Sequence, residues 1–151
     1  MHLNDETATR AIGARLARVL VPGLRVYLHG DLGSGKTTLA RGLLRELGYQ
    51  GRVKSPTYTL VELYTVSRLN LYHFDFYRFR EPKEWRDAGF NEYFNDASVC
   101  LVEWPEKAAD LLPAANLDIA FEFAGDGRDL SVRAGTDRGR ACLKRMMQMP
   151  L

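Results

Sequence analysis

The string Gly30-Asp31-Leu32-Gly33-Ser34-Gly35-Lys36-Thr37 constrains this chain more than any other feature of its sequence. It fits the pattern GxxxxGK[ST], in which a glycine-rich turn joins a strand to a helix and wraps around phosphate groups. Arg25 to His29 is typical of a short buried strand directly before the turn. After the turn, leucines recur every four residues from Leu39 to Leu47, and Gly48 can end that helix in a left-handed conformation. Strand, turn and helix in this order predict a phosphate-binding site.

Each residue type in this glycine-rich turn, which is called a P-loop, has a chemical reason to be there. Gly30, Gly33 and Gly35 can adopt positive φ, so successive backbone N–H groups can converge on phosphate oxygens. We expect Lys36 to bridge the β and γ phosphates and Thr37 to offer its hydroxyl to Mg²⁺, so that the chain binds ATP with magnesium. The residues expected to bind the nucleotide from this motif are Gly30, Asp31, Gly33, Ser34, Gly35, Lys36, Thr37 and Thr38.

Two carboxylates follow apolar runs, as the metal-side acid of a P-loop nucleotidase does. Glu103 ends the continuous apolar run Ser98 to Val102, which is typical of a buried parallel strand, so we favour it with Thr37 for metal contact. Asp75 is expected to hold the water shell of the metal or to orient the attacking water. With Lys36, these two acids form the expected catalytic set, and a surface ion pair is the alternative for each.

Three further positions carry weaker signals. Ser55 to Tyr58 follows the P-loop helix, where many nucleotidases sense the γ-phosphate, and Thr57 is the candidate sensor; an ordinary Ser-Pro turn is the equal alternative. His73 is more ordinarily a hydrogen-bonded core histidine than a ligand. Trp104 is first a packing aromatic.

The remaining segments complete one α/β domain over residues 1–151. We expect a mixed central sheet, with a parallel core and some antiparallel strands, flanked by helices in a P-loop nucleotidase-like fold. Helical segments are predicted at Asp5 to about Leu20, capped by Asn4 or Asp5, at Pro82 to Phe94 as a helix or helical lid, at Ala108 to Leu112 and at Asp137 to Met147. Extended segments are predicted at Val53 to Tyr58, Thr59 to Val66, Leu69 to Phe79, Leu117 to Phe123 and Leu130 to Ala134, with turns at Ser67-Arg68 and Gly125-Asp126-Gly127.

Composition narrows the class of protein further. The chain is 46% hydrophobic and 26% charged, and no run approaches the ~20 apolar residues of a membrane span, so we expect a soluble protein without a membrane partner. Its start lacks a secretory signal, which favours the cytoplasm. Cys100 and Cys142 show no metal-site spacing. A net charge of +2 does not identify a nucleic-acid binder; the arginines frequent in the last third are more ordinarily a solvated face than an RNA contact.

Four motifs together resemble the bacterial TsaE (YjeE) family, the ATPase component of tRNA threonylcarbamoyladenosine biosynthesis. They are GDLGSGKTT at Gly30 to Thr38, SPTY at Ser55 to Tyr58, HxDxYR at His73 to Arg78 and EWPE at Glu103 to Glu106. The resemblance spans nearly the whole chain, and the combination is far more specific than the P-loop alone. Glu81 to Ala97 carries no recognisable signature.

The resemblance implies a small, weakly active ATPase that acts with the proteins TsaB and TsaD. Together these proteins form the threonylcarbamoyl group on adenosine 37 of tRNAs reading ANN codons, with the transfer itself belonging to TsaD, so that tRNA is met indirectly through the complex. Carried over by motif, Lys36 and Thr37 bind phosphate and Mg²⁺, Glu103 approaches the metal and Asp75 is the second acid. Thr7 lies where the family's N-terminal segment approaches the adenine, and Trp104 supports the site.

Two other functions stay open at this point. A P-loop small-molecule kinase would need an acceptor pocket and an arginine-bearing lid, for which Arg78, Arg80 and Arg86 are candidates. An ATP-gated docking module would use nucleotide binding alone to order a surface, without required hydrolysis.

Overall fold

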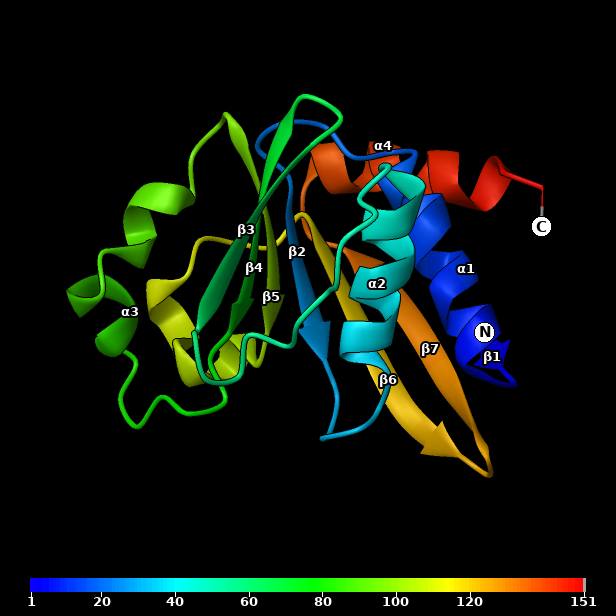
Figure 1. Ribbon diagram of the computed structural model, residues 1–151, viewed down its shortest axis with the longest axis horizontal. Helices are drawn as coiled ribbons and strands as arrows, with labels where there is room; N and C mark the ends of the chain where they lie inside the picture. Colours follow the sequence, from blue (N-terminus) through cyan, green and yellow to red (C-terminus); the bar gives the residue numbers. More distant parts are fainter. Residues whose placement is uncertain (151) are drawn as a thin grey trace.

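A seven-stranded sheet organises the computed structural model, which describes residues 1–150 (Figure 1). The strands are β1 (His2–Leu3), β2 (Arg25–His29), β3 (Val61–Val66), β4 (Leu69–Asp75), β5 (Ser98–Glu103), β6 (Leu117–Ala124) and β7 (Gly127–Ala134). The helices are α1 (Glu6–Ala17), α2 (Lys36–Glu46), α3 (Glu84–Asp87) and α4 (Asp137–Gln148), with short 3-10 helices η1 (Phe90–Tyr93), η2 (Pro105–Lys107) and η3 (Ala109–Leu111).

The strand order is β1-β7-β6-β2-β5-β4-β3. β6, β2, β5 and β4 run parallel. At the two edges, β3 pairs antiparallel with β4, β7 pairs antiparallel with β6, and β1 pairs antiparallel with β7. The predicted α/β fold, with a parallel core and antiparallel strands, is therefore confirmed. The carboxyl ends of the parallel strands meet at one edge of the sheet, the edge at which ligands bind in open α/β sheets.

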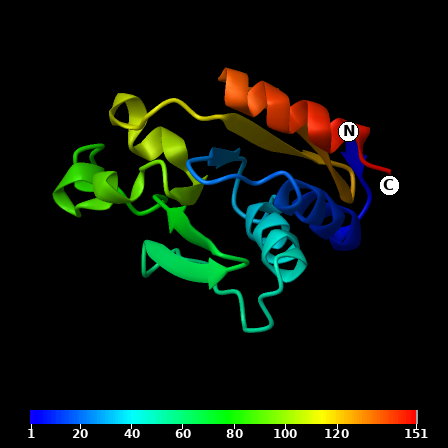
Figure 2. The same cartoon turned by 90° about the horizontal axis from the view of Figure 1, so that it is seen from above.

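The two faces of the sheet carry different cores. One face presents aliphatic side chains such as Leu28, Leu101 and Ile119 beneath α1 and α2, which lie side by side in Figure 2. The opposite face is aromatic, and Phe74, Phe76 and Phe90 lie there within 6.2 Å of one another, centroid to centroid. Because side chains alternate along a strand, residues 73, 75 and 103 fall on the α2 face with Leu71 and Leu101.

Two glycines let α1 and α2 approach closely. A Cβ atom at Gly13 would lie 2.1 Å from the carbonyl oxygen of Leu39, and one at Gly42 would lie 2.1 Å from that of Arg10. No side chain fits at such distances, so this contact requires glycine on both helices. It fixes the position of α2, whose first residue is Lys36.

Most predicted elements are found, with shifted boundaries. The first helix is capped by Asp5, whose side chain accepts from the Ala8 N–H, and it ends at Ala17 rather than near Leu20. The predicted strand Leu69 to Phe79 stops at Asp75. β1 was not predicted, because a two-residue strand has too little sequence to show a period.

Three segments differ in kind from their predictions. Val53 to Tyr58 is not a strand: its end enters a turn at residues 56–59, closed by a bond from the Leu60 N–H to the Pro56 carbonyl. The predicted helix or lid from Pro82 to Phe94 is interrupted at Gly89, where φ is +77°. Ala108 to Leu112 forms a 3-10 turn, since too few residues precede Pro113 for an α-helix.

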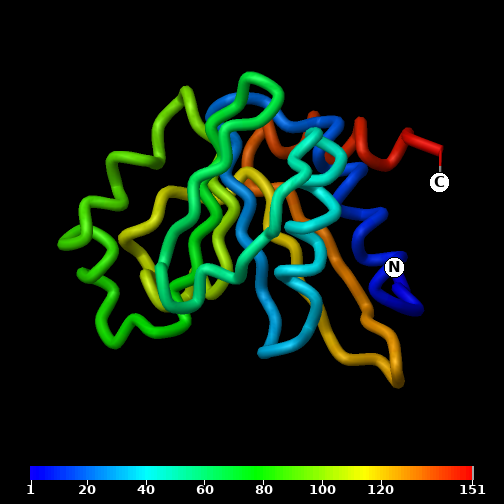
Figure 3. Tube along the Cα trace, viewed as in Figure 1, coloured from blue at the N-terminus to red at the C-terminus, as the bar shows by residue number. Residues whose placement is uncertain are grey.

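Figure 3 traces the chain and shows both ends of the described part on the β7 side of the molecule. Among residues 1–150, no helix is both long enough and apolar enough to span a lipid bilayer.

Candidate nucleotide-binding site

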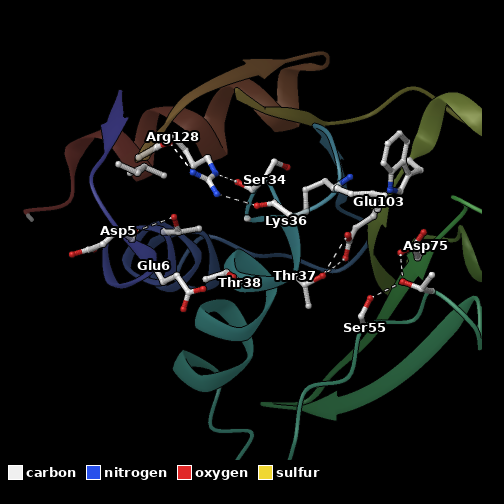
Figure 4. Close-up of a pocket in the computed structure, with 18 of the residues that line it drawn as sticks. Asp5, Glu6, Ser34, Lys36, Thr37, Thr38, Ser55, Asp75, Glu103 and Arg128 are labelled. Atoms are coloured by element: carbon white, nitrogen blue, oxygen red, sulfur yellow. Dashed lines mark hydrogen bonds between the residues drawn. The ribbon is translucent and has the colours of Figure 1, made fainter. Parts of the chain in front are cut away.

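A cleft of about 320 Å³ opens at the carboxyl ends of β2, β4 and β5. The P-loop forms its floor, the first turn of α1 and the β6–β7 turn form one wall, and the carboxylates of β4 and β5 form the other (Figure 4). Its polar and charged lining consists of Asp5, Glu6, Thr9, Ser34, Lys36, Thr37, Thr38, Ser55, Thr57, Asp75, Glu103, Asp126 and Arg128.

The P-loop has the backbone that its glycines predict. Gly30, Gly33 and Gly35 have φ values of +147°, +75° and +117°. A Cβ atom at Gly30 would also lie 2.6 Å from the Ser34 hydroxyl, so that position requires glycine for space as well as conformation. α2 begins directly at Lys36, and the positive end of its dipole faces the cleft.

Lys36 extends across the loop to which it belongs. Its Nζ donates a hydrogen bond to the Gly30 carbonyl and lies 3.9 Å from the centre of the Trp104 ring. Burial lowers the pKa of Lys36, and the nearby carboxylates of Glu103 and Asp75 oppose that shift. Trp104 has a φ of +59°, a strained conformation for a non-glycine residue, which turns the chain at the end of β5 and brings the indole over the ammonium group.

Glu103 is held between two side chains from different elements. The Thr37 hydroxyl donates to Oε2 of Glu103 at 3.1 Å, and Nε2 of His73 lies 2.7 Å from the same oxygen. His73 is fully buried and Glu103 is 3% exposed. Burial by itself would raise the pKa of Glu103, but His73, Lys36 and the Thr37 hydroxyl together lower it, so the carboxylate is anionic at neutral pH.

Asp75 belongs to a second, adjoining network. It pairs in register with Glu103 across β4 and β5, accepts from the Thr57 hydroxyl at 3.1 Å and accepts from the Tyr77 N–H at 2.9 Å. Ser55 and Thr57 share a further hydrogen bond of 2.8 Å. Burial raises the pKa of Asp75, the Glu103 charge adds to the rise, and the hydrogen bonds oppose it. The turn at Thr57 is thus tied to the end of β4.

Arg128 is a site residue that the sequence did not reveal. It lies on β7, and its guanidinium donates to the carbonyls of Ser34 and Gly33, both at 3.1 Å. It also stacks on Phe123, with its Cζ 4.4 Å from the ring centre. The only sequence signal was the Asp-Gly turn directly before it, which places the start of a strand but not its distance from the P-loop.

The other expected residues lie at different distances from the cleft. Thr38 lines it, whereas Gly30 and Asp31 lie at the start of the loop outside the lining. Thr7 is exposed on α1 and accepts a hydrogen bond from Arg10, while Asp5, Glu6 and Thr9 of the same segment line the cleft. The adenine contact expected of Thr7 therefore stays a prediction.

The oxygen atoms of Thr37 and Glu103 are of the type that Mg²⁺ prefers, and they lie close enough to share one ion. Within residues 1–150, no group of three or more His, Cys, Asp and Glu side chains is arranged to hold a metal alone. Phosphate oxygens and water would therefore have to complete the shell, which is the usual way in which Mg²⁺ is bound beside a nucleotide.

Comparison with known proteins places the chain in a family. The model of the family described as Threonylcarbamoyl adenosine biosynthesis protein TsaE matches residues 3–130. The tRNA threonylcarbamoyladenosine biosynthesis protein TsaE of Haemophilus influenzae is 42% identical over 144 residues, which are 92% of this chain and 91% of that protein. The protein of the same name from Bacillus subtilis is 42% identical over 118 residues, 78% of this chain and 73% of that protein.

A solved structure agrees with these sequence matches. The crystal structure of Bacillus subtilis YdiB superimposes with a TM-score of 0.85 at 32% identity, over 98% of this chain and 93% of that one. The resemblance inferred from the four motifs is thereby confirmed. The chain belongs to the TsaE family.

Proposed function

We propose that this protein binds ATP with Mg²⁺ and hydrolyses it weakly as a component of tRNA threonylcarbamoyladenosine biosynthesis, acting with TsaB and TsaD. Membership of the TsaE family and the names of its relatives support a role in this pathway. The cleft supports ATP binding and hydrolysis. The main observation behind this part of the proposal is that four residues from three separate segments line a single cleft beside the P-loop: Lys36, Thr37, Asp75 and Glu103.

The residues of the cleft divide the work of such a site. Mg²⁺, when bound, would supply positive charge to offset that of the phosphate groups. Thr37 and Glu103 would hold that ion, and His73 keeps the Glu103 carboxylate turned toward Thr37. Lys36 would exchange its bond to the Gly30 carbonyl for phosphate oxygens. Asp75, whose pKa is raised, can accept a proton from water more readily than an unperturbed aspartate, and Thr57 links it to the SPTY turn.

The test is ATP hydrolysis by the purified chain, alone and with TsaB, TsaD and unmodified tRNA, while modified adenosine is counted over many turnovers. We expect repeated modification to require this chain, and Lys36→Ala to remove both ATP binding and that requirement. ATP binding without any influence on modification would contradict the proposal. Modification that survives loss of hydrolysis but still needs ATP would instead support the docking module.

A second comparison assigns the two acids. We expect Glu103→Ala to weaken the Mg²⁺ dependence of hydrolysis more than Asp75→Ala does, because Glu103 faces Thr37 and Asp75 faces Thr57. Equal Mg²⁺ dependence in the two variants would contradict this assignment.

No observation favours a small-molecule kinase. The arginines suggested as its lid are absent from the lining of the cleft in the described part of the chain. Arg78 instead stacks on Tyr58, with its Cζ 4.7 Å from the ring centre.

A further inference from the structure

The outer face of α4 concentrates positive charge. α4 (Asp137–Gln148) carries four cations, Arg138, Arg140, Lys144 and Arg145, against one carboxylate, a net charge of +3. The whole chain has a net charge of only +2, so everything outside this helix sums to −1. An asymmetry of this kind marks one surface as the place where a polyanion would be attracted. We call these four residues the basic face of α4.

The basic face of α4 lies on the outside of the protein. Gly139, Cys142 and Met146 on the inner side of α4 are buried against the protein, and all four cations are exposed. Thr136 caps the helix by accepting from the Gly139 N–H, and Asn116 donates to the same hydroxyl. The cap and the buried inner side therefore hold α4 in place, with its four cations exposed on the outer side.

Few of these cations are neutralised by the protein itself. Arg140 pairs with Asp137, one turn away. No carboxylate within residues 1–150 forms an ion pair with Lys144 or Arg145. The helix is about 18 Å long at ~1.5 Å per residue, enough to follow several phosphates of a nucleic-acid strand.

We propose that the basic face of α4 is a docking surface for the sugar-phosphate backbone of RNA, and specifically of the tRNA substrate. This rests on the proposed function, which supplies tRNA as a component of the same reaction. RNA is favoured over an acidic protein because the exposed side chains are mostly charged or polar, with Met147 as the one large apolar exception. Protein interfaces instead depend on buried apolar anchors. A membrane surface is not favoured, since the apolar side of α4 is already buried.

The position of α4 makes this contact compatible with nucleotide binding. Arg138 donates to the Pro22 carbonyl and Cys142 contacts the Val19 carbonyl, both just before β2. The P-loop follows the other end of β2, so α4 and the P-loop lie at opposite ends of the sheet (Figure 1). The cleft is lined by the P-loop and so lies away from α4. α4 also lies beyond residues 3–130, the part matched by the family model. RNA could therefore contact α4 while the cleft holds ATP.

The test measures binding of the full chain to an unmodified tRNA transcript by fluorescence anisotropy, from 50 to 200 mM NaCl. The variant is Lys144→Gln with Arg145→Gln, and the matched control is Arg41→Gln with Lys83→Gln, which removes the same charge from other exposed elements. The salt slope is the change of log K with log salt concentration, and each lost phosphate contact reduces its magnitude by ~0.7. Two lost contacts reduce it by ~1.4, so we expect the α4 variant to bind about 25-fold more weakly at 0.1 M salt. We expect the control pair to bind within about 3-fold of wild type.

Three results would overturn the proposal: no tRNA binding by the wild-type chain, an equal loss in the control pair, or tighter binding of poly-glutamate than of tRNA at equal charge concentration. The last would assign the face to an acidic protein. Failure of the proposed function can be distinguished from failure of this proposal, because ATP binding and tRNA binding are measured independently. Lys36→Ala should leave tRNA binding unchanged, and the α4 variant should leave ATP binding unchanged, so either claim can fail while the other stands.

Discussion

At the scale of single residues, the cleft places two carboxylates side by side and shifts their pKa values in opposite directions. Glu103 is surrounded by Lys36, His73 and the Thr37 hydroxyl, which lower its pKa despite burial. Asp75 has burial and the neighbouring Glu103 charge raising its pKa. Paired acids whose pKa values are driven apart are suited to different tasks, with one holding a cation and the other accepting a proton.

His73 determines how Glu103 faces the P-loop. His73→Leu would leave the buried carboxylate without its 2.7 Å partner, and we expect the apparent Mg²⁺ affinity in ATP hydrolysis to fall about 10- to 100-fold. His73→Gln keeps a side-chain donor and should lose less. His29→Leu is the matched control, because His29 also lies 2.7 Å from a carboxylate, that of Asp118, but is half-buried outside the cleft. An unchanged Mg²⁺ dependence in His73→Leu would show that Glu103 does not need this histidine.

The raised pKa of Asp75 gives stability a pH dependence of known sign. Because the folded protein disfavours the ionised form, the wild type loses stability as pH rises from the ordinary aspartate range through the raised folded pKa. Asp75→Asn cannot ionise, so the difference in free energy of unfolding between this variant and the wild type should shift in the variant's favour as pH rises above the ordinary aspartate range. The difference should level off once the pH has passed the raised pKa of the folded wild type. Urea unfolding at several pH values measures this, with Asp126→Asn in the exposed turn as control. A difference that stays constant or changes in the opposite direction would contradict the shift.

At the scale of elements, the contact between α1 and α2 sets the position of the P-loop helix. Gly42→Ala forces a methyl group toward the Arg10 carbonyl, 2.1 Å away, and we expect it to lower the free energy of unfolding by ~2 kcal/mol or more. The same change at an open helical position would stabilise the protein by ~1 kcal/mol, so the sign alone is diagnostic. Arg41→Ala, the exposed neighbour, should change stability by less than ~0.5 kcal/mol in the same urea titration.

The β6–β7 hairpin contributes to the site through Arg128. Arg128→Met keeps the aliphatic stem but removes both hydrogen bonds to the P-loop carbonyls, and we expect the Kd for ATP to rise about 10- to 100-fold. Arg133→Met removes an exposed arginine from the same strand and should bind ATP as the wild type does. Calorimetry on both variants decides the point, and equal affinities would leave Arg128 without a role in binding.

At the scale of the whole molecule, local signals in the sequence predicted more than long-range ones did. The P-loop, β2, α2 and β5 follow from short patterns, and Glu103 follows from its place at the end of an apolar run. Arg128 could not be predicted, because its contact with Ser34 spans 94 residues and depends on which strands pair. The helix expected at Pro82 to Phe94 failed for a related reason, since Gly89 and the aromatic core beneath it decide where that segment turns.

Calorimetric titration of the purified chain with ATP and Mg²⁺ measures whether the cleft binds ATP through Lys36. Lys36→Ala removes a buried ammonium that would make two charged hydrogen bonds to phosphate, so we predict binding roughly 100-fold weaker or lost, while Lys83→Ala at an exposed site matches wild type. Wild-type protein that does not bind ATP, or Lys36→Ala that binds it equally well, would show that the cleft is not an ATP site held by this lysine.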